Sequence, residues 1–314
     1  MLSSLSEGPA GREPRKLWLP LGAASPLGRF VLMELTWHVY NPDSEANRIL
    51  VLGGSLGGDT THQWEQVAGH LADDALIVFT HLPGQGMGDV WDDTVEPTME
   101  NVASAFAETV RKVQQLRPGA PTFVGGLSLT GALAMYLARD MADELAGVIV
   151  VASAATVGTS PEAWEERARL VEEKGTVALV EDAQRRWFRR DYIAEEPGKV
   201  AAIMEGLAAA DDHSYAQLCR CLATHDLRGD LDRIYTPMLL VASEHDVSTP
   251  MGDVELVLTS APGADMRIVP DVAHMITVAA PGTVADIIRG FFRRLKQEHW
   301  SVYDVTEGDT RLGH

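Results

Sequence analysis

Three residues that could together carry out acyl transfer lie far apart in the chain: Ser128, Asp246 and His274. A serine hydroxyl is a weak nucleophile until a base takes its proton, and an imidazole serves as that base when a carboxylate fixes its tautomer. The stretch between Ser128 and Asp246 has room for an inserted segment, and the stretch between Asp246 and His274 has room for one helix and one strand. The sequence therefore predicts a nucleophile, an acid and a general base that the fold must bring together.

Ser128 lies at a sharp turn between a predicted strand and a predicted helix. The apolar run 122–124 leads into Gly125-Gly126-Leu127-Ser128, and apolar residues at helical spacing follow. Gly-x-Ser at such a junction is typical of a nucleophile elbow, where small neighbours fit a tight turn and the hydroxyl lies beside free N–H groups. Thr130 occupies a position where a second glycine is expected. The competing interpretation is an ordinary glycine-rich turn in which Ser128 caps the helix.

Other side chains compete for the acid and base roles: Glu244, Asp253, His81 and His245. We favour Asp246 over the two other acids because Glu-His-Asp follows an apolar strand directly, at the depth where a carboxylate reaches an imidazole. One competing histidine precedes the serine, and the other is next to the acid and is expected to point away from it. A solvated turn aspartate and a loop histidine remain the structural alternatives for Asp246 and His274.

An oxyanion hole needs two backbone N–H donors. Leu129, directly after the nucleophile, is predicted to supply one of them. Leu56 is predicted to supply the other from the turn Gly54-Ser55-Leu56-Gly57, which follows the apolar run 48–52. A phosphate-binding loop is the alternative for this turn, but it has neither a lysine after its glycines nor a GxGxxG pattern.

The elements around these residues predict an α/β fold with a mostly parallel, doubly wound sheet. Residues 28–40 are expected to form one or two antiparallel edge strands. Parallel strands that are apolar throughout are covered by helices on both faces, and the loops at their carboxyl ends converge on one crevice. The apolar runs that predict strands are 48–52, 75–79, 122–124, 145–151, 238–242 and 265–269; the principal core helices are expected at 98–116 and 282–295.

The alternation of strands and helices breaks in a charge-rich stretch, 158–232. Only helical patterns occur there, which predicts a helical cap inserted before the acid-bearing strand. The helical patterns lie at 161–173, 177–189, 199–209 and 214–223. The predicted organisation is a poorly ordered lead-in at 1–27, an α/β core at 28–157 and 233–296, the cap at 158–232, and a C-terminal tail at 297–314.

Composition limits the partners. The 314 residues carry a formal net charge of −19, which opposes non-specific binding to nucleic acid or to an anionic membrane. No apolar stretch is long enough to span a membrane, and the N-terminus lacks the apolar centre of a signal peptide, so we expect a cytoplasmic enzyme. Cys219 and Cys221 are poorly placed for a disulfide, and no metal or cofactor is predicted. A small lactone or ester is the expected partner, and the protein is expected to be a monomer or a homo-oligomer.

These motifs together resemble the α/β-hydrolases, and within them the sequence is most similar to the 3-oxoadipate enol-lactonases of aromatic-compound degradation. The resemblance covers roughly residues 28–295. Departures occur at Pro83-Gly84-Gln85-Gly86, where the family usually has Arg-Gly-His-Gly, at Thr130, and at both termini, which are longer than usual. The segments that carry the resemblance are Ser55-Leu56-Gly57 with Trp64, Gly126-Leu127-Ser128-Leu129, Arg186-Trp187-Phe188, Tyr215 to Cys221 with Asp226-Leu227-Arg228, Asp246, and Ala273-His274.

The resemblance implies a cofactor-free serine hydrolase of the β-ketoadipate pathway that opens 3-oxoadipate enol-lactone to 3-oxoadipate through an acyl-enzyme. Trp187 and Phe188 are expected to line the roof of the pocket, although such an aromatic pair also suits a cap core. Arg220 is the residue we expect to bind the substrate carboxylate. Other cap arginines are also available: Arg185, Arg186, Arg189 and Arg190.

Other functions remain compatible with the same triad. A carboxylesterase would hydrolyse simple aryl esters but not the enol-lactone. A cofactor-free perhydrolase or haloperoxidase, or a biosynthetic hydrolase of a bulkier acyl or lactone group, would also keep all three residues. A non-catalytic binding protein of this fold is the remote alternative, because such proteins commonly lose a member of the triad.

Overall fold

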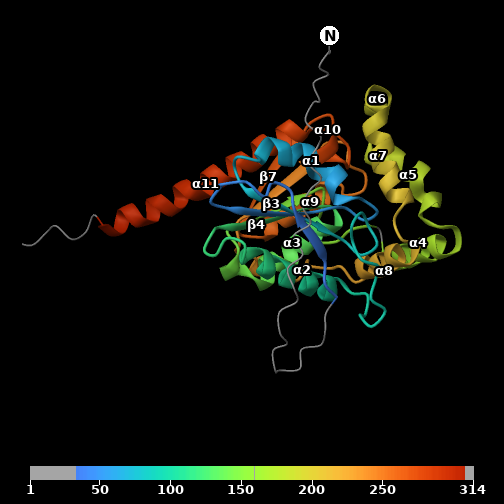
Figure 1. Ribbon diagram of the computed structural model, residues 1–314, viewed down its shortest axis with the longest axis horizontal. Helices are drawn as coiled ribbons and strands as arrows, with labels where there is room; N and C mark the ends of the chain where they lie inside the picture. Colours follow the sequence, from blue (N-terminus) through green and yellow to red (C-terminus); the bar gives the residue numbers. More distant parts are fainter. Residues whose placement is uncertain (1–32, 159, 308–314) are drawn as a thin grey trace, which may run out of the picture. The chain divides into compact units, whose positions relative to one another are not determined.

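The computed structural model describes residues 33–158 and 160–307, and a seven-stranded sheet organises them (Figure 1). The strand order is β1-β3-β2-β4-β5-β6-β7. β1 runs antiparallel to β3, and every other neighbouring pair is parallel. The predicted doubly wound sheet with an antiparallel edge is confirmed. The strands are β1 (Thr36–Val39), β2 (Ile49–Gly53), β3 (Leu76–His81), β4 (Thr122–Leu127), β5 (Gly147–Val151), β6 (Met238–Ser243) and β7 (Ala264–Val269).

Helices cover both faces of this sheet, which is why β2 to β6 are buried at every position. In Figure 1, α1 (Thr60–Leu71) and α11 (Pro281–Glu307) lie together over one face. α2 (Met99–Gln114) and α3 (Leu129–Asp140) lie together over the other face. The apolar strands therefore form the core, and loops follow their carboxyl ends.

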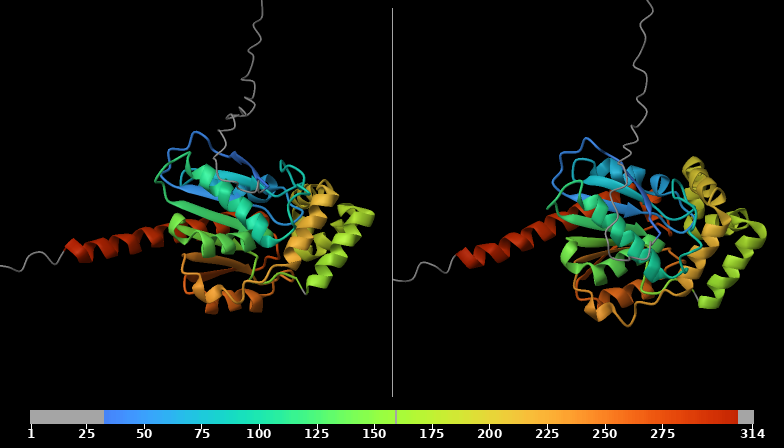
Figure 2. Two further views of the ribbon diagram at one scale, coloured as in Figure 1. Left: turned by 90° about the horizontal axis from the view of Figure 1, so that it is seen from below. Right: turned by 60° about the horizontal axis from the view of Figure 1, so that its bottom comes forward.

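Among the described residues, five α-helices lie between β5 and β6 and gather at one side of the sheet (Figure 2). They are α4 (Pro161–Lys174), α5 (Val180–Trp187), α6 (Arg190–Glu195), α7 (Pro197–Ala208) and α8 (Asp212–Ala223). Ser214 Oγ of α8 accepts a 2.8 Å hydrogen bond from the N–H of Trp91, in the loop after β3. α8 therefore contacts a loop at the carboxyl end of the sheet. The division into core and cap at 158 and 232 stays a prediction.

Two helix predictions need correction. The helix predicted at 177–189 ends at Trp187, because Phe188 is extended (φ −128°, ψ 147°), and the separate helix α6 follows. The helix predicted at 282–295 continues to Glu307 as part of α11. No glycine or proline occurs between Lys296 and Glu307, so nothing local ends the helix where the tail was predicted.

Some predictions lie outside the described residues: the lead-in 1–27, the start of the edge segment 28–40, and positions 308–314 of the tail. Within residues 33–158 and 160–307, no helix is both long enough and apolar enough to cross a membrane.

Candidate active site

Ser128 lies between β4 and α3 in a strained conformation with φ 54° and ψ −110°. A non-glycine residue with positive φ costs roughly 1–3 kcal/mol, and such strain persists only where the surroundings enforce it. Here the turn is too tight for a side chain at Gly126, since an added Cβ would lie 2.2 Å from the carbonyl carbon of Thr130. The Ser128 side chain makes no capping hydrogen bond to α3, so the interpretation of Ser128 as a helix cap does not hold.

His274 and Asp246 are joined by a buried hydrogen bond of 2.8 Å between Nδ1 and Oδ2. Asp246 follows β6 and His274 follows β7, so two neighbouring strands bring the pair together. Asp246 Oδ1 also accepts from the N–H groups of Ser248 (2.7 Å) and Thr249 (3.1 Å), and Oδ2 accepts from Thr249 Oγ1 (2.5 Å). Burial opposes ionisation of Asp246, but the charge of His274 and these hydrogen bonds outweigh it and lower the pKa.

The competing acids and histidines lie elsewhere. Glu244 and Asp253 are exposed. His81 Nε2 lies 3.1 Å from His38 Nδ1, at the β1–β3 edge of the sheet. In the described part of the chain no hydrogen bond joins Ser128 Oγ to His274. Catalytic hydrogen bonds are often long before substrate binds.

The two predicted oxyanion donors, Leu129 and Leu56, come after the neighbouring strands β4 and β2. Leu129 begins α3, so its N–H points out of the helix start, and Leu56 follows β2 in the adjacent turn. Within residues 33–158 and 160–307, neither N–H donates to a protein acceptor. Both amides are therefore available to a ligand oxygen.

Two glutamines that the sequence reasoning missed hold the Leu56 turn. Gln63 Oε1 accepts from the N–H of Ser55 (2.8 Å), and Gln63 Nε2 donates to Ser55 Oγ (2.7 Å). Gln85 Oε1 accepts from the N–H groups of Gly57 (3.0 Å) and Gly58 (3.2 Å). Gln85 lies in the segment Pro83-Gly84-Gln85-Gly86, which departs from the usual enol-lactonase pattern. That departure is the signal in the sequence that could have pointed to Gln85.

The predicted substrate residues have different surroundings. The carbonyl of Trp187 accepts from the N–H of Met275 (3.1 Å), and its ring centroid lies 6.5 Å from that of His274. Phe188 is buried and stacks on Tyr192 with ring centroids 5.5 Å apart. Trp187 is thus beside the predicted base, whereas Phe188 packs within the cap.

Arg220 is already engaged by two carboxylates. Its Nε lies 3.1 Å from Glu165 and its Nη1 lies 2.7 Å from Glu172, both on α4. A substrate carboxylate would have to compete with both. The role predicted for Arg220 remains untested, and this geometry does not favour it.

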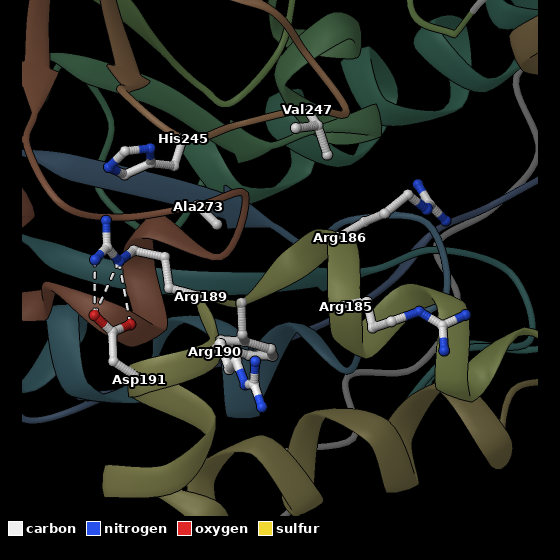
Figure 3. A pocket seen from close by; sticks show the side chains of 9 residues that line it. Arg185, Arg186, Arg189, Arg190, Asp191, His245, Val247 and Ala273 are labelled. Carbon is white, nitrogen blue, oxygen red and sulfur yellow. Dashed lines mark hydrogen bonds and ion pairs between the residues drawn. The ribbon is translucent and has the colours of Figure 1, made fainter.

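The remaining predicted arginines line an open pocket of about 590 Å³ beside the loops that carry Asp246 and His274 (Figure 3). Arg189 is held by Asp191 at 2.7 Å, as the dashed lines in Figure 3 show. Arg185 and Arg186 pair with acidic residues of their own helix. The described residues that line this pocket do not include Ser128, so we treat the pocket as separate from the nucleophile. The lining residues are Arg185, Arg186, Phe188, Arg189, Arg190, Asp191, His245, Val247 and Ala273.

One group in the described ranges has the side chains of a metal site: Glu244, His245 and Asp271, whose ligand atoms lie within 4.8 Å of one another. All three are exposed, and Arg189 lies 3.4 Å from Asp271, which disfavours a cation there. Cys219 and Cys221 are free and buried. Burial raises the pKa of the Cys219 thiol to about 12, so it is not a thiolate at neutral pH.

Comparison with known proteins agrees with this architecture. A sequence model of the alpha/beta hydrolase family matches residues 49–287. The chain is 25% identical over 245 residues to 3-oxoadipate enol-lactonase 2 of Acinetobacter baylyi, covering 78% of this chain and 88% of that protein.

Solved structures show the same arrangement. The enol-lactonase of Burkholderia xenovorans LB400 superposes with a TM-score of 0.74 at 25% identity, covering 82% of this chain and 96% of that one. A thermophilic esterase from Thermogutta terrifontis has the same fold, with a TM-score of 0.74 at 22% identity and coverage of 83% and 93%. The family match spans most of the sheet and the helices inserted into it. The chain belongs to the alpha/beta hydrolase family.

Proposed function

We propose that this hydrolase uses Ser128 as a nucleophile, and that its substrate is a small lactone, 3-oxoadipate enol-lactone in the first instance. The observation that carries the proposal is the buried 2.8 Å hydrogen bond between His274 and Asp246, which follow β7 and β6, on the same side of β4 and its strained serine turn in the strand order. The enol-lactonase names of the relatives at 25% identity support the choice of substrate. A cytoplasmic location and a monomeric or homo-oligomeric state are further parts of this proposal.

The proposed reaction has two halves. His274 takes the Ser128 proton while the serine oxygen attacks the lactone carbonyl, and the N–H groups of Leu56 and Leu129 stabilise the oxyanion. The carbon–oxygen bond of the ring then breaks, and the enol oxygen leaves with the proton that His274 returns. An enol is more acidic than an alcohol, so it is the better leaving group. The released enol arm tautomerises to the ketone.

Water completes the cycle. His274 takes a proton from a water molecule that attacks the acyl-enzyme, and returns that proton to Ser128 as the ester bond breaks. Asp246 stays ionised throughout, which agrees with the direction of its pKa, and it stabilises the imidazolium that forms twice per turnover.

A spectrophotometric assay tests the proposal. Enzymatically generated 3-oxoadipate enol-lactone is added to the wild-type protein and to Ser128→Ala, with p-nitrophenyl acetate as a second substrate. We expect rapid loss of the lactone that depends on Ser128. Serine-dependent cleavage of the aryl ester without lactone turnover would reject the enol-lactone and leave a carboxylesterase. Equal activity of Ser128→Ala and wild type would reject the nucleophile.

A further inference from the structure

We propose that the cavity lined by Arg185, Arg186, Arg189 and Arg190 binds the phosphate group of a small organic phosphate, and that this ligand changes the rate of hydrolysis without occupying the site of Ser128 (Figure 3). We call this cavity the arginine pocket. A phosphate ester is neither the substrate nor the product of the proposed reaction. The inference therefore goes beyond that function and does not depend on which lactone or ester is hydrolysed.

The arginine pocket gathers positive charge on an acidic protein. The described residues that line it include four guanidinium groups and one carboxylate, that of Asp191. The net charge of −19 repels anions at a distance, so an anion that binds here must be held by these local cations. The cavity of about 590 Å³ is in the size range that takes a small organic molecule.

Arg190 can bind an anion without losing a partner. Its side chain is exposed at the start of α6. Across residues 33–158 and 160–307, this side chain makes no hydrogen bond or ion pair with the protein, and in Figure 3 no dashed line joins it to the other residues drawn. An incoming anion therefore gains a charge-assisted hydrogen bond to Arg190 at no cost to the fold.

The other three arginines are held by exposed ion pairs. Each pairs with a carboxylate whose side chain is more than half exposed, and such pairs contribute little because water and salt screen them. A phosphate monoester carries a charge of about −1.5 to −2 at pH 7 and three acceptor oxygens, so it is a stronger partner for several guanidinium groups than a singly charged carboxylate. The pairs that it would replace are Arg185–Glu181 (2.5 Å), Arg186–Asp182 (2.7 Å) and Arg189–Asp191 (2.7 Å).

Apolar side chains complete the lining and favour an organic ligand. Phe188 and Ala273 are buried, whereas Val247 is 65% exposed. A ligand with a small apolar or aromatic body removes the Val247 side chain from water, which favours binding. An aromatic body also suits the arginines, because guanidinium groups stack on ring faces. We therefore expect an aryl phosphate to bind more tightly than inorganic phosphate.

The walls of the arginine pocket come from the neighbours of the proposed acid and base. His245 and Val247 flank Asp246, and Ala273 directly precedes His274. The nucleophile is not among the described residues that line the pocket. A ligand in this cavity would therefore contact the loops of the acid and the base without blocking the serine.

Two long contacts join the arginines to these loops. Arg186 Nη1 lies 3.4 Å from Oγ of Ser248, the residue whose N–H donates to Asp246. Arg189 Nη1 lies 3.4 Å from Asp271, in the loop after β7. Both contacts are weak at this length, so a phosphate group that recruits the two guanidinium groups can replace them. Occupancy then changes how α5 and α6 are tied to the loops of the acid and the base, which would alter turnover.

Calorimetric titration at low ionic strength tests the site with phenyl phosphate, phenyl sulfate and inorganic phosphate. Phenyl sulfate has nearly the shape of phenyl phosphate but a single negative charge, so we expect it to bind at least about tenfold more weakly. Inorganic phosphate lacks the apolar body and is also expected to bind more weakly. Equal affinity for phenyl phosphate and either of the other two anions would overturn the inference, as would no binding of phenyl phosphate at millimolar concentration.

Arg190→Gln identifies the pocket. Because Arg190 pairs with no other described residue, its replacement leaves the ion pairs of the fold in place, and we expect phenyl phosphate to bind about tenfold or more weakly. Arg228→Gln is the matched control, because Arg228 is an exposed arginine outside the pocket that pairs with Asp226. Unchanged affinity in Arg190→Gln, or an equal loss in Arg228→Gln, would reject the site.

Hydrolysis of p-nitrophenyl acetate separates an effector from an inhibitor at the nucleophile. At saturating phenyl phosphate, the wild-type rate is expected to reach a plateau that differs from the unliganded rate but stays above zero, whereas Arg190→Gln is expected to keep its unliganded rate. Complete competitive inhibition that persists in Arg190→Gln would place the anion at Ser128, and an unchanged wild-type rate would remove the effect on turnover; either result overturns the inference. If Ser128→Ala hydrolyses the ester as fast as wild type, only the proposed function fails, because calorimetry still reports on the pocket.

Discussion

Thr130 Oγ1 donates a 2.6 Å hydrogen bond to the carbonyl oxygen of Gly54 and so ties the start of α3 to the turn that carries Leu56. Thr130 stands where the elbow pattern has glycine. Gly53 supplies the space for it, because an added Cβ at that position would lie 2.3 Å from Thr130 Cγ2. Gly53 in β2 therefore makes room for the threonine that replaces the motif glycine. The Thr130 hydrogen bond links the two segments that carry the predicted oxyanion donors.

Thr130→Val tests this link because valine has the same shape without the hydroxyl. The buried carbonyl of Gly54 loses its partner, so we expect the free energy of unfolding to fall by about 1–3 kcal/mol. We also expect kcat to fall because the Leu56 turn is less firmly held. Urea denaturation and ester hydrolysis measure the two effects. Thr130→Ser keeps the hydroxyl and should stay close to wild type; equal losses in both variants would argue against the hydrogen bond.

Gly53→Ala tests the space that β2 provides. The new methyl group meets Thr130 Cγ2, and overpacking of this kind costs about 1–3 kcal/mol of unfolding free energy. Thr130→Gly removes the obstacle, so the double variant should lose less than the sum of the single variants, with a coupling of more than about 1 kcal/mol. Chemical denaturation of all four proteins gives that coupling, and additive losses would show that the two positions are independent.

Sequence alone predicted the sheet and the chain order of Ser128, Asp246 and His274, because apolar strands and their terminal loops are local patterns. It did not separate α6 from α5, since the break is a single extended residue, Phe188. The residues that support the site could not be predicted from the sequence either. Gln63 and Gln85 contact the Leu56 turn from other segments of the chain, and no spacing rule connects them with it.

Asp246→Asn tests the acid. The amide keeps the shape of the side chain but does not hold the His274 imidazole in the tautomer that accepts a proton from serine. By analogy with other serine hydrolases, kcat should fall by about 10³- to 10⁴-fold with little change in KM. Thr249→Val removes one hydrogen bond to the carboxylate and should cost only about tenfold. Hydrolysis of p-nitrophenyl acetate measures both, and an Asp246→Asn rate within tenfold of wild type would contradict the assignment.

Gln85→Leu tests the support of the oxyanion turn. The buried N–H of Gly57 loses its acceptor, whereas the N–H of Gly58 keeps the carbonyl of Ser55 (3.1 Å), so unfolding free energy should fall by about 1–3 kcal/mol and kcat should fall with it. Gln85→Glu restores an acceptor but adds a negative charge next to the place where the oxyanion forms. Thermal melting should therefore recover in Gln85→Glu relative to Gln85→Leu, whereas kcat should not. Recovery of both would show that the turn needs only an acceptor.

The His38–His81 pair predicts how stability depends on pH. Burial, together with the neighbouring His38, lowers the pKa of His81 to about 4, although Asp59 opposes the shift; burial also lowers the pKa of His38. The unfolded chain binds these protons near pH 6.5. Because the folded pKa values lie below the unfolded ones, the stabilisation is complete above about pH 6.5 and is lost as the pH falls towards 4.

For His81 that loss is up to about 3 kcal/mol of unfolding free energy. We expect urea denaturation at pH 7 and pH 5 to show a clear drop for the wild type and a smaller one for His81→Gln, which cannot take up the proton. His62→Gln is the control, because His62 is an exposed histidine on α1 and should leave the drop unchanged. The same pH dependence in all three proteins would mean that the two imidazoles at the β1–β3 edge do not control acid stability.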